Sequence, residues 1–211
     1  QYFREQALTT SRHVIPFINS ILQVSEEISV LEIGCGEGGN LKPFLDAGCR
    51  RITGIDISEG KISNARKFYS SIPGGEKVEF IAADIYDSAS AGKFDLVMMR
   101  DVLEHIHDQK RFLGFVKLFL DQGGVLFIGF PPWNNPFGGH QQMCESRILS
   151  KLPWFHLLPK AMYRGILKMF GESEARIKGL LEVRETGINL GWFERTIRKE
   201  GFIILKKSLW L

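Results

Sequence analysis

The sequence of 211 residues is long enough for one domain with a sizeable core and one insertion. Its composition, 44% hydrophobic and 24% charged, is ordinary for a globular protein and excludes the disordered and fibrous classes. A net charge of only +3 argues against a protein whose whole surface follows nucleic acid, although a local basic face is still allowed.

The three cysteines, Cys35, Cys49 and Cys144, form no C-x-x-C pair. The pattern therefore predicts neither a disulfide framework nor a structural zinc site, and no metal is expected. Because reduced cysteines are typical of the cytosol, we expect a cytoplasmic protein. No stretch approaches the roughly 18 apolar residues of a membrane span, so any membrane contact would be at the surface.

The N-terminal region is expected to form a helix. Apolar side chains after position 13 recur with the spacing of one helical face, and Thr10 or Ser11 would cap the helix. The helix either packs against the sheet edge or contributes a lid over the mouth of a ligand site. The expected lid consists of Tyr2, Phe3 and Arg4.

Residues 30–41, VLEIGCGEGGNL, read as a buried strand followed by a glycine-rich turn that leads into a helix. Closely spaced glycines let the backbone turn sharply and approach a ligand without a Cβ atom in the way. Gly34, Gly36 and Gly39 fit the motif G-x-G-x-x-G. Gly34, Gly36 and Gly38 fit the motif G-x-G-x-G. The spacing therefore agrees with a dinucleotide site and with an S-adenosylmethionine site.

Two acidic residues flank this glycine loop. Asp56 lies 20 residues after Gly36, at the end of the next expected strand, where it could accept hydrogen bonds from the ribose of either cofactor. Glu32 distinguishes them better, because a carboxylate beside the loop would repel a pyrophosphate. The same carboxylate could attract the cationic amino-acid end of S-adenosylmethionine, or organise water around it. The electrostatics therefore favour a sulfonium cofactor.

Strands and helices alternate through the rest of the core. Strands are expected over residues 51–56, 77–82, 94–99 and 125–130, and helices over about 41–45, 58–69 and 109–120. This alternation predicts a mostly parallel, doubly wound sheet with right-handed crossovers. In such a sheet, ligands bind beyond the carboxyl ends of the strands.

Five stretches of the sequence resemble, in the family's own order, the class I S-adenosylmethionine-dependent methyltransferases of the small-molecule type. They are VLEIGCGEGG at 30–39, GIDIS at 54–58, AADIYD at 82–87, FDLVMMRDVLEHIHD at 94–108 and GGVLFIGFPP at 123–132. Their joint occurrence is far more specific than any glycine pattern. The resemblance implies an α/β, Rossmann-like fold, S-adenosylmethionine as cofactor and S-adenosylhomocysteine as its product.

The resemblance also implies where the cofactor lies. Asp56 would bind the ribose hydroxyls, Asp84 the adenine amino group, and Arg100 would sit under the methionine portion. Asp also caps turns, but two acids at successive strand ends beside a glycine loop favour binding. The candidate cofactor-binding residues are Glu32, Gly34, Cys35, Gly36, Gly38, Asp56, Ile57, Asp84, Ile85 and Arg100.

Methyl transfer is a direct displacement, so the candidate catalytic residues depend on the acceptor atom. A neutral amine needs little beyond alignment, whereas a phenol or alcohol needs a general base. His140 is the expected base, His105 is the reserve, and Asp101 could instead position an amine. A loop histidine without a chemical role and a histidine that orders a turn are the structural alternatives. Oxygen is favoured slightly over nitrogen.

The alternation of strands and helices breaks between residues 131 and 190, which is too long for an ordinary connection. The part between His140 and Phe170 holds five basic residues and one acid, with an expected amphipathic helix over 160–170. We expect an inserted substrate lid for a small-molecule or lipid-like acceptor, and residues 150–170 could touch a membrane surface. A subdomain that merely covers the core is the alternative.

The expected organisation comprises an N-terminal helix or lid (1–28), a cofactor-binding core (29–130), the inserted lid (131–190) and a C-terminal helix and strand completing the core (191–211). The C-terminal strand is expected over 202–209. The family usually closes its sheet with a reversed hairpin of two strands, so we expect a truncated chain, because a free apolar edge invites aggregation.

Other functions are less well supported. A nicotinamide oxidoreductase conflicts with Glu32, and a non-catalytic cofactor-binding module or an N-methyltransferase of a small molecule stays open. No stable nucleic-acid partner is expected, because MMRDVLEHI after the fourth strand lacks the N-P-P-[YF] type motif of base amino methylation. The sequence does not identify the acceptor or the oligomeric state.

Overall fold

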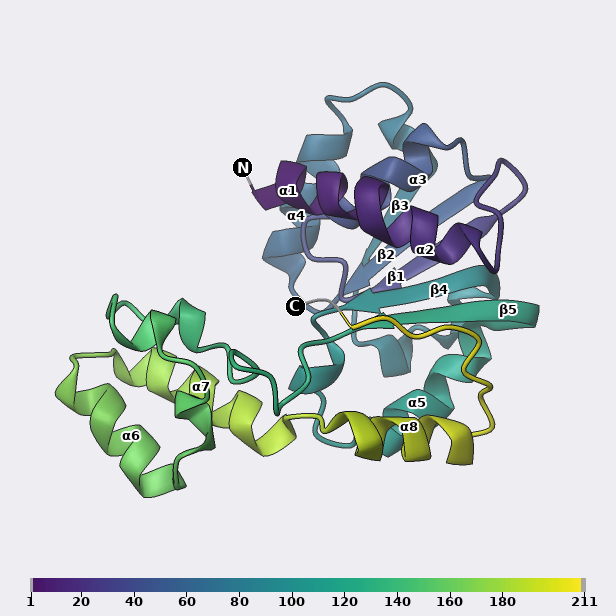
Figure 1. Cartoon of the computed structure of the whole chain (residues 1–211). Helices are drawn as coiled ribbons and strands as arrows, with labels where there is room; N and C mark the ends of the chain where they lie inside the picture. The colour runs from purple at the N-terminus through teal and green to yellow at the C-terminus, as the bar shows by residue number, and fades with distance from the viewer. Residues whose placement is uncertain (1, 210–211) are drawn as a thin grey trace. The chain divides into compact units, whose positions relative to one another are not determined.

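A computed structural model describes residues 2–209, without the side chain of Tyr2. Five strands form one sheet in the order β3-β2-β1-β4-β5 (Figure 1). They are β1 Ser29–Ile33, β2 Arg51–Asp56, β3 Val78–Ala82, β4 Phe94–Arg100 and β5 Leu120–Gly129. β1 pairs in parallel with both β2 and β4, and β2 pairs in parallel with β3. The predicted α/β, Rossmann-like class is confirmed, and the strand order reverses at β1, where such sheets bind ligands.

The helices lie between these strands and after the last of them. They are α1 Tyr2–Thr9, α2 Ile15–Asn19, α3 Lys42–Asp46, α4 Glu59–Tyr69, α5 Gln109–Val116, α6 Lys160–Met169, α7 Glu174–Thr186 and α8 Leu190–Lys199. Ser58 caps α4 by accepting a hydrogen bond from the amide of Lys61, as its sequence position indicates. Asn189 caps α8 in the same way.

The chain divides into two compact units. The first contains the residues up to Arg100 together with Phe115–Ile128, and the second contains Asp101–Gly114 and the chain from Gly129 onward. All candidate cofactor-binding residues belong to the first unit, whereas the three catalytic candidates belong to the second. The four expected segments stay a prediction.

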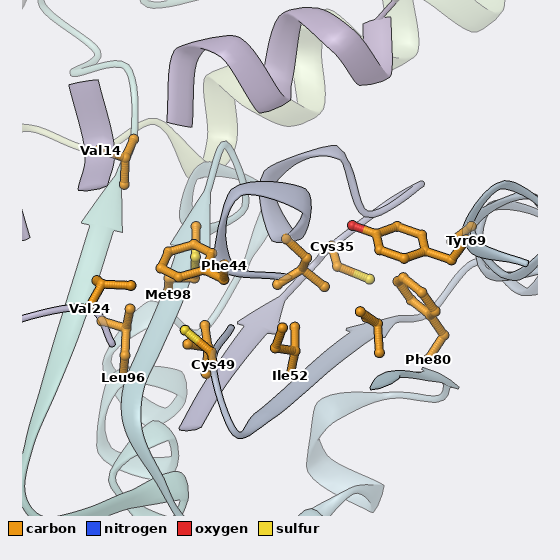
Figure 2. Packing of buried hydrophobic residues seen from close by; sticks show 14 of the residues in the cluster. Val14, Val24, Cys35, Phe44, Cys49, Ile52, Tyr69, Phe80, Leu96 and Met98 are labelled. Carbon is orange, nitrogen blue, oxygen red and sulfur yellow. The ribbon is translucent and has the colours of Figure 1, made fainter. Parts of the chain in front are cut away.

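The core of the first unit explains why its strands are read so clearly from the sequence. All five residues of β1 are buried, as expected of a strand covered on both faces. Figure 2 shows Phe44 beside Met98 and Leu96 beside Val24, with Tyr69 and Phe80 in contact farther along the cluster.

The second unit has its own apolar cluster. Tyr163 and Leu167 of α6 are fully buried there, together with Ile177 and Leu180 of α7. Phe155 of the preceding loop completes the packing, with its ring 4.7 Å from that of Tyr163. The region after β5 therefore contains a small folded subdomain rather than an irregular connection.

Several sequence expectations need correction. The N-terminal helix begins at Tyr2, and Thr10 does not cap it but lies buried in a π-helical turn, Thr10–Val14. β5 begins at Leu120 rather than at residue 125. The strand therefore includes Gly123 and Gly124, which were expected to precede it. A Cβ atom on Gly124 would lie 3.0 Å from the carbonyl oxygens of Asp121 and Phe94, so glycine permits this close backbone approach.

The strand expected over 202–209 is not formed. This segment has no regular secondary structure, and Ile203 is 84% exposed. A strand requires a neighbour that shares its ladder of hydrogen bonds, and the sheet of the described chain ends at β5. Within residues 2–209, no helix combines the length and apolarity that crossing a bilayer would require.

Candidate functional site

The glycine loop follows β1 and is tied to the end of β2. The amides of Gly34 and Cys35 donate hydrogen bonds of 2.7 and 3.1 Å to the carbonyl of Ile55. Gly34 and Gly36 have φ values of 70° and 55°, which favour glycine. A Cβ atom on Gly36 would find only a Lys61 methylene, 4.0 Å away. The backbone at Gly36 therefore faces open space, as a ligand that approaches closely would require.

Gly38 has a different role from Gly36. A Cβ atom at Gly38 would lie 2.8 Å from the ring of Phe80, and the Tyr69 hydroxyl donates a 2.7 Å hydrogen bond to the Gly38 carbonyl. Figure 2 shows Cys35, Tyr69 and Phe80 grouped on this side of the cluster. The structure thus places Gly38 against the core and Gly36 toward open space, a distinction that glycine spacing does not reveal.

Asp56 connects the end of β2 to the loop. Its Oδ2 accepts a 2.8 Å hydrogen bond from the Gly36 amide, and its Oδ1 accepts one of 2.8 Å from Ser58. Each carboxylate oxygen has two lone pairs, so both can accept a further hydrogen bond. The side chain therefore fixes the loop and keeps the capacity to bind a vicinal diol. The neighbouring Ile57 is 76% exposed, as an apolar side chain available to a ligand would be.

Asp84 lies at the end of the adjacent strand. The Ala83 amide donates a 3.1 Å hydrogen bond to the Asp56 carbonyl, so the two strand ends that carry the acids lie side by side. Asp84 caps a short 3-10 turn through a 2.9 Å hydrogen bond from the Tyr86 amide, and its side chain is exposed. Ile85 is buried behind it. The turn-capping role is thus present, and solvent access leaves Asp84 able to bind a ligand as well.

Glu32 is buried within β1 and only half satisfied. Its Oε1 accepts a 2.7 Å hydrogen bond from Asn40 Nδ2, whereas its Oε2 has no hydrogen-bond partner among the described residues. Burial raises the pKa of the Glu32 carboxyl from 4.5 to about 8, against the opposing effects of Asn40 and Arg100. Such an orphaned oxygen can accept a hydrogen bond or a positive charge from a ligand.

A polar network that the sequence did not predict holds Asn40 in place. Arg100 donates to Asn40 Oδ1 at 2.8 Å and to the Thr10 hydroxyl at 3.2 Å, and Thr10 donates to Asn40 Oδ1 at 2.8 Å. With its oxygen occupied twice, the Asn40 amide must present its nitrogen to Glu32. Arg100 therefore acts on the loop through Asn40. Its only signal in the sequence is a charge at the end of an apolar strand.

The expected lid residues lie beside this loop. Phe3 is buried, with its ring centroid 3.8 Å from that of Phe68, and Arg4 is exposed. A Cβ atom on Gly39 would lie 2.8 Å from the Phe3 carbonyl oxygen, so α1 packs directly on the glycine loop. The side chain of Tyr2 lies outside the described part of the chain. Whether α1 moves as a lid stays a prediction.

The structure brings two of the three catalytic candidates together in the second unit. The rings of His105 and His140 meet edge to face, with centroids 5.6 Å apart. Asp101 and His140 both have φ near 55°, a sparsely populated conformation that recurs at functional sites. The Asp101 amide donates a 2.9 Å hydrogen bond to the Gly129 carbonyl, which joins the chain after β4 to the end of β5.

Other reactive side chains have ordinary structural explanations. Burial raises the pKa of the Cys35 thiol well above its usual range, so this cysteine is no nucleophile at neutral pH. His156 is fully buried, with Nε2 2.7 Å from the Trp133 carbonyl and Nδ1 3.1 Å from the Gln141 amide nitrogen. Among residues 2–209, no group of three His, Cys, Asp or Glu side chains could hold a metal ion.

Comparison with protein families gives a match over most of the chain. The family model described as "Methyltransferase domain" matches residues 3–174. The match contains the glycine loop, Asp56, Asp84 and the segment from Asp101 to His140. It extends beyond β5 through α6.

Two curated relatives are similar over about half of this chain. A ubiquinone biosynthesis O-methyltransferase of Aromatoleum aromaticum is 34% identical over 101 residues, which cover 47% of this chain and 42% of the relative. An mRNA cap guanine-N(7) methyltransferase of Schizosaccharomyces pombe is 31% identical over 129 residues, which cover 56% of this chain and 36% of the relative. The chain thus spans about 40% of the length of these relatives.

A solved structure is similar over nearly the whole chain. Magnesium protoporphyrin IX methyltransferase from Synechocystis PCC 6803, solved with bound S-adenosylhomocysteine, superposes with a TM-score of 0.63. The alignment covers 98% of this chain and 78% of that protein at 19% identity. At this identity the likeness concerns the fold.

Proposed function

The chain belongs to the methyltransferase domain family, as a class I S-adenosylmethionine-dependent methyltransferase, and we propose that it methylates a small or amphiphilic acceptor. The observation that carries the proposal is the arrangement at the carboxyl edge of the sheet. An open glycine backbone at Gly36 lies beside Asp56, and a half-satisfied carboxyl group, Glu32, is buried behind the loop. Family membership sets aside the nicotinamide oxidoreductase.

The residues of the loop fit the parts of this cofactor. When bound, S-adenosylmethionine supplies a methyl group attached to a positively charged sulfur. Asp56 would accept hydrogen bonds from the ribose hydroxyls, and Asp84 would accept one from the adenine amino group. Gly34 and Gly36 would lie along the amino-acid portion. The orphaned Oε2 of Glu32 would face its cationic end, directly or through water.

We assign the acceptor atom as oxygen, with N-methylation of a small molecule as the alternative. One of the two relatives is an O-methyltransferase and the other an N(7)-methyltransferase, so they do not distinguish the two acceptor atoms. His140 supports oxygen, because its ring lies within 3.6 Å of a buried carboxylate and is 14% exposed. A phenol or alcohol loses a proton on methylation, whereas a neutral amine can attack without a base.

The region after β5 supports an amphiphilic acceptor. Large apolar side chains are exposed between β5 and α7, and they are Phe137, Met143, Ile148, Leu152, Trp154, Leu157, Met162, Met169 and Phe170. The exposed Arg147 and Lys151 lie next to Ile148 and Leu152 in the sequence. Basic and apolar side chains in alternation suit a molecule with an apolar body and an acidic group, and they suit contact with an anionic membrane surface.

Calorimetry and a product assay test the proposal. Titration of the folded chain with S-adenosylhomocysteine is expected to give saturable binding, and no binding would refute the cofactor assignment. Incubation with methyl-labelled donor and a panel of phenols, amines and amphiphilic acids is expected to label a phenolic oxygen, as identified by mass spectrometry. Labelling of nitrogen alone would select the alternative. Co-sedimentation with phosphatidylglycerol vesicles, but not with phosphatidylcholine vesicles, would support the membrane contact.

A further inference from the structure

The carboxyl group of Glu104 is buried without a hydrogen bond. The residue is 1% exposed, and neither of its side-chain oxygens has a hydrogen-bond partner among the described residues. It belongs to a 3-10 turn, Leu103–His105, that begins three residues after β4. A buried carboxylate that lacks hydrogen bonds is costly unless another group compensates its charge. Glu104 therefore needs an explanation beyond packing.

The imidazole of His140 is the nearby group that can compensate the charge of Glu104. Its Nε2 is 3.6 Å from Glu104 Oε1, and its side chain is 14% exposed. The ring of His105 packs edge to face against it. The distance exceeds that of a normal hydrogen bond, but such bonds between catalytic groups are often long before the reacting molecule binds.

Both partners are held by the surrounding backbone. The Thr186 hydroxyl at the end of α7 donates to the Glu104 carbonyl, and Gln109 Nε2 donates to the carbonyls of Leu103 and Thr186 at 3.2 and 2.5 Å. The His140 amide donates a 3.1 Å hydrogen bond to Phe137. The approach of the carboxylate to the imidazole is thus built into two anchored turns of one compact unit.

We propose that Glu104 is a positioning residue that makes His140 a general base, an inference that rests on the proposed function. The carboxylate would hold the Nε2–H of the imidazole, so that Nδ1 carries the free lone pair. His140 Nδ1 then takes the proton of the acceptor's hydroxyl as its oxygen bonds to the methyl carbon and the carbon–sulfur electrons pass to the sulfur. Glu104 stabilises the resulting imidazolium, which afterwards releases its proton to water.

The pair restricts the class of acceptor. A base of this kind serves an acceptor that carries a removable proton on oxygen, such as a phenol or an enol. A neutral amine gains nothing from it. The proposed preference for an oxygen acceptor therefore depends on the carboxylate of Glu104 and the imidazole of His140 together.

Imidazole nitrogen NMR on the full chain tests this relation without cofactor or acceptor. Long-range proton–nitrogen spectra distinguish the two neutral tautomers and the imidazolium of each histidine. In the wild type at pH 8 we expect His140 to carry its proton on Nε2. The opposite tautomer would overturn the proposal, and this result needs no variant.

The variant Glu104→Gln removes the charge at nearly constant volume, and Glu182→Gln removes an exposed carboxylate of the same unit as the matched control. At pH 8 the ratio of the Nε2–H to the Nδ1–H tautomer of His140 is expected to fall severalfold in Glu104→Gln, because a carboxylate is a stronger hydrogen-bond acceptor than an amide oxygen. In Glu182→Gln it should not change. An equal ratio in all three proteins would overturn the proposal, with the exposed His107 as internal reference in each sample.

Kinetics separate this inference from the proposed function. With any phenol that the wild type methylates, Glu104→Gln is expected to lower kcat at least tenfold and to leave the affinity for S-adenosylhomocysteine unchanged. Unchanged kcat would refute the role of Glu104 while the methyltransferase assignment stands. If the wild type binds no S-adenosylhomocysteine, the proposed function fails, and the NMR result still decides the relation between Glu104 and His140.

Discussion

Replacing Glu32 by glutamine should stabilise the ligand-free protein at neutral and alkaline pH. The folded state holds the Glu32 proton with a pKa of about 8, whereas an unfolded chain releases it near 4.5. The protonated Glu32 therefore makes its full contribution to the unfolding free energy below pH 4.5. This contribution decreases as the pH rises from 4.5 to 8. At about 1.4 kcal/mol for each tenfold change in proton affinity, the loss at pH 8 is about 4 kcal/mol. Glu32→Gln removes this titration and can still accept the Asn40 hydrogen bond.

Urea unfolding of both proteins between pH 5 and pH 8 measures this difference. The unfolding free energy of Glu32→Gln should exceed that of the wild type by an amount that grows with pH. The control Glu27→Gln, which neutralises an exposed acid of the same unit, should follow the wild-type curve. Parallel curves for Glu32→Gln and the wild type would refute the account of Glu32 as a buried, half-satisfied acid.

The carboxyl group of Glu32 should strengthen the binding of S-adenosylhomocysteine, although it lowers the stability of the ligand-free protein. Binding of a cationic amino group near Oε2 favours the ionised carboxylate, so the wild type should release protons when it binds S-adenosylhomocysteine at pH 7. Calorimetry in buffers of different ionisation enthalpy measures this release. Glu32→Gln should bind more weakly and release fewer protons. Equal proton release by the two proteins would show that the carboxyl group does not sense the ligand.

Three further outcomes follow from the geometry. Asp56→Asn should weaken S-adenosylhomocysteine binding at least tenfold in calorimetry, because one charged acceptor for the ribose is lost; an unchanged affinity would contradict the role of Asp56. Gly38→Ala should lower the unfolding free energy by about 1–3 kcal/mol, since its Cβ would meet Phe80 at 2.8 Å. Gly36→Ala strains the positive φ but meets no atom closer than 4.0 Å, so it should lower stability less and also weaken ligand binding. Equal stability losses would argue against this division. Burial lowers the pKa of His156 from 6.5. The contribution of the neutral imidazole to the unfolding free energy should therefore be lost as the pH falls below about 6.5. In urea unfolding at several pH values, His156→Gln should show a weaker pH dependence of the unfolding free energy in this range.

The sequence predicted those features whose cause is local. The alternation of apolar strands and helices, the Ser58 cap and the glycine turn after β1 each follow from neighbouring residues, and the structure contains all three. The acids Asp56 and Asp84 were placed at strand ends because parallel strands end at one edge of a sheet. In the structure Asp56 ends β2 and Asp84 follows two residues after the end of the adjacent β3.

The features that the sequence missed depend on residues far apart in the chain. Thr10 meets Asn40 only because a π-helical turn brings its hydroxyl to the loop, and nothing around position 10 indicates that turn. Gly36 and Gly38 look alike in the sequence, and only the position of Phe80 separates their roles. The strand over 202–209 was expected from its apolar residues alone, whereas a strand also needs a paired neighbour.

We propose that Asp56 and the glycine loop bind the methyl donor, and a crystal structure with S-adenosylhomocysteine would test this binding site. We expect density for the ribose with both hydroxyls within hydrogen-bonding distance of the Asp56 carboxylate, and the amino-acid end beside Gly34 and Gly36. Density for the nucleoside at any other place on the chain would contradict it.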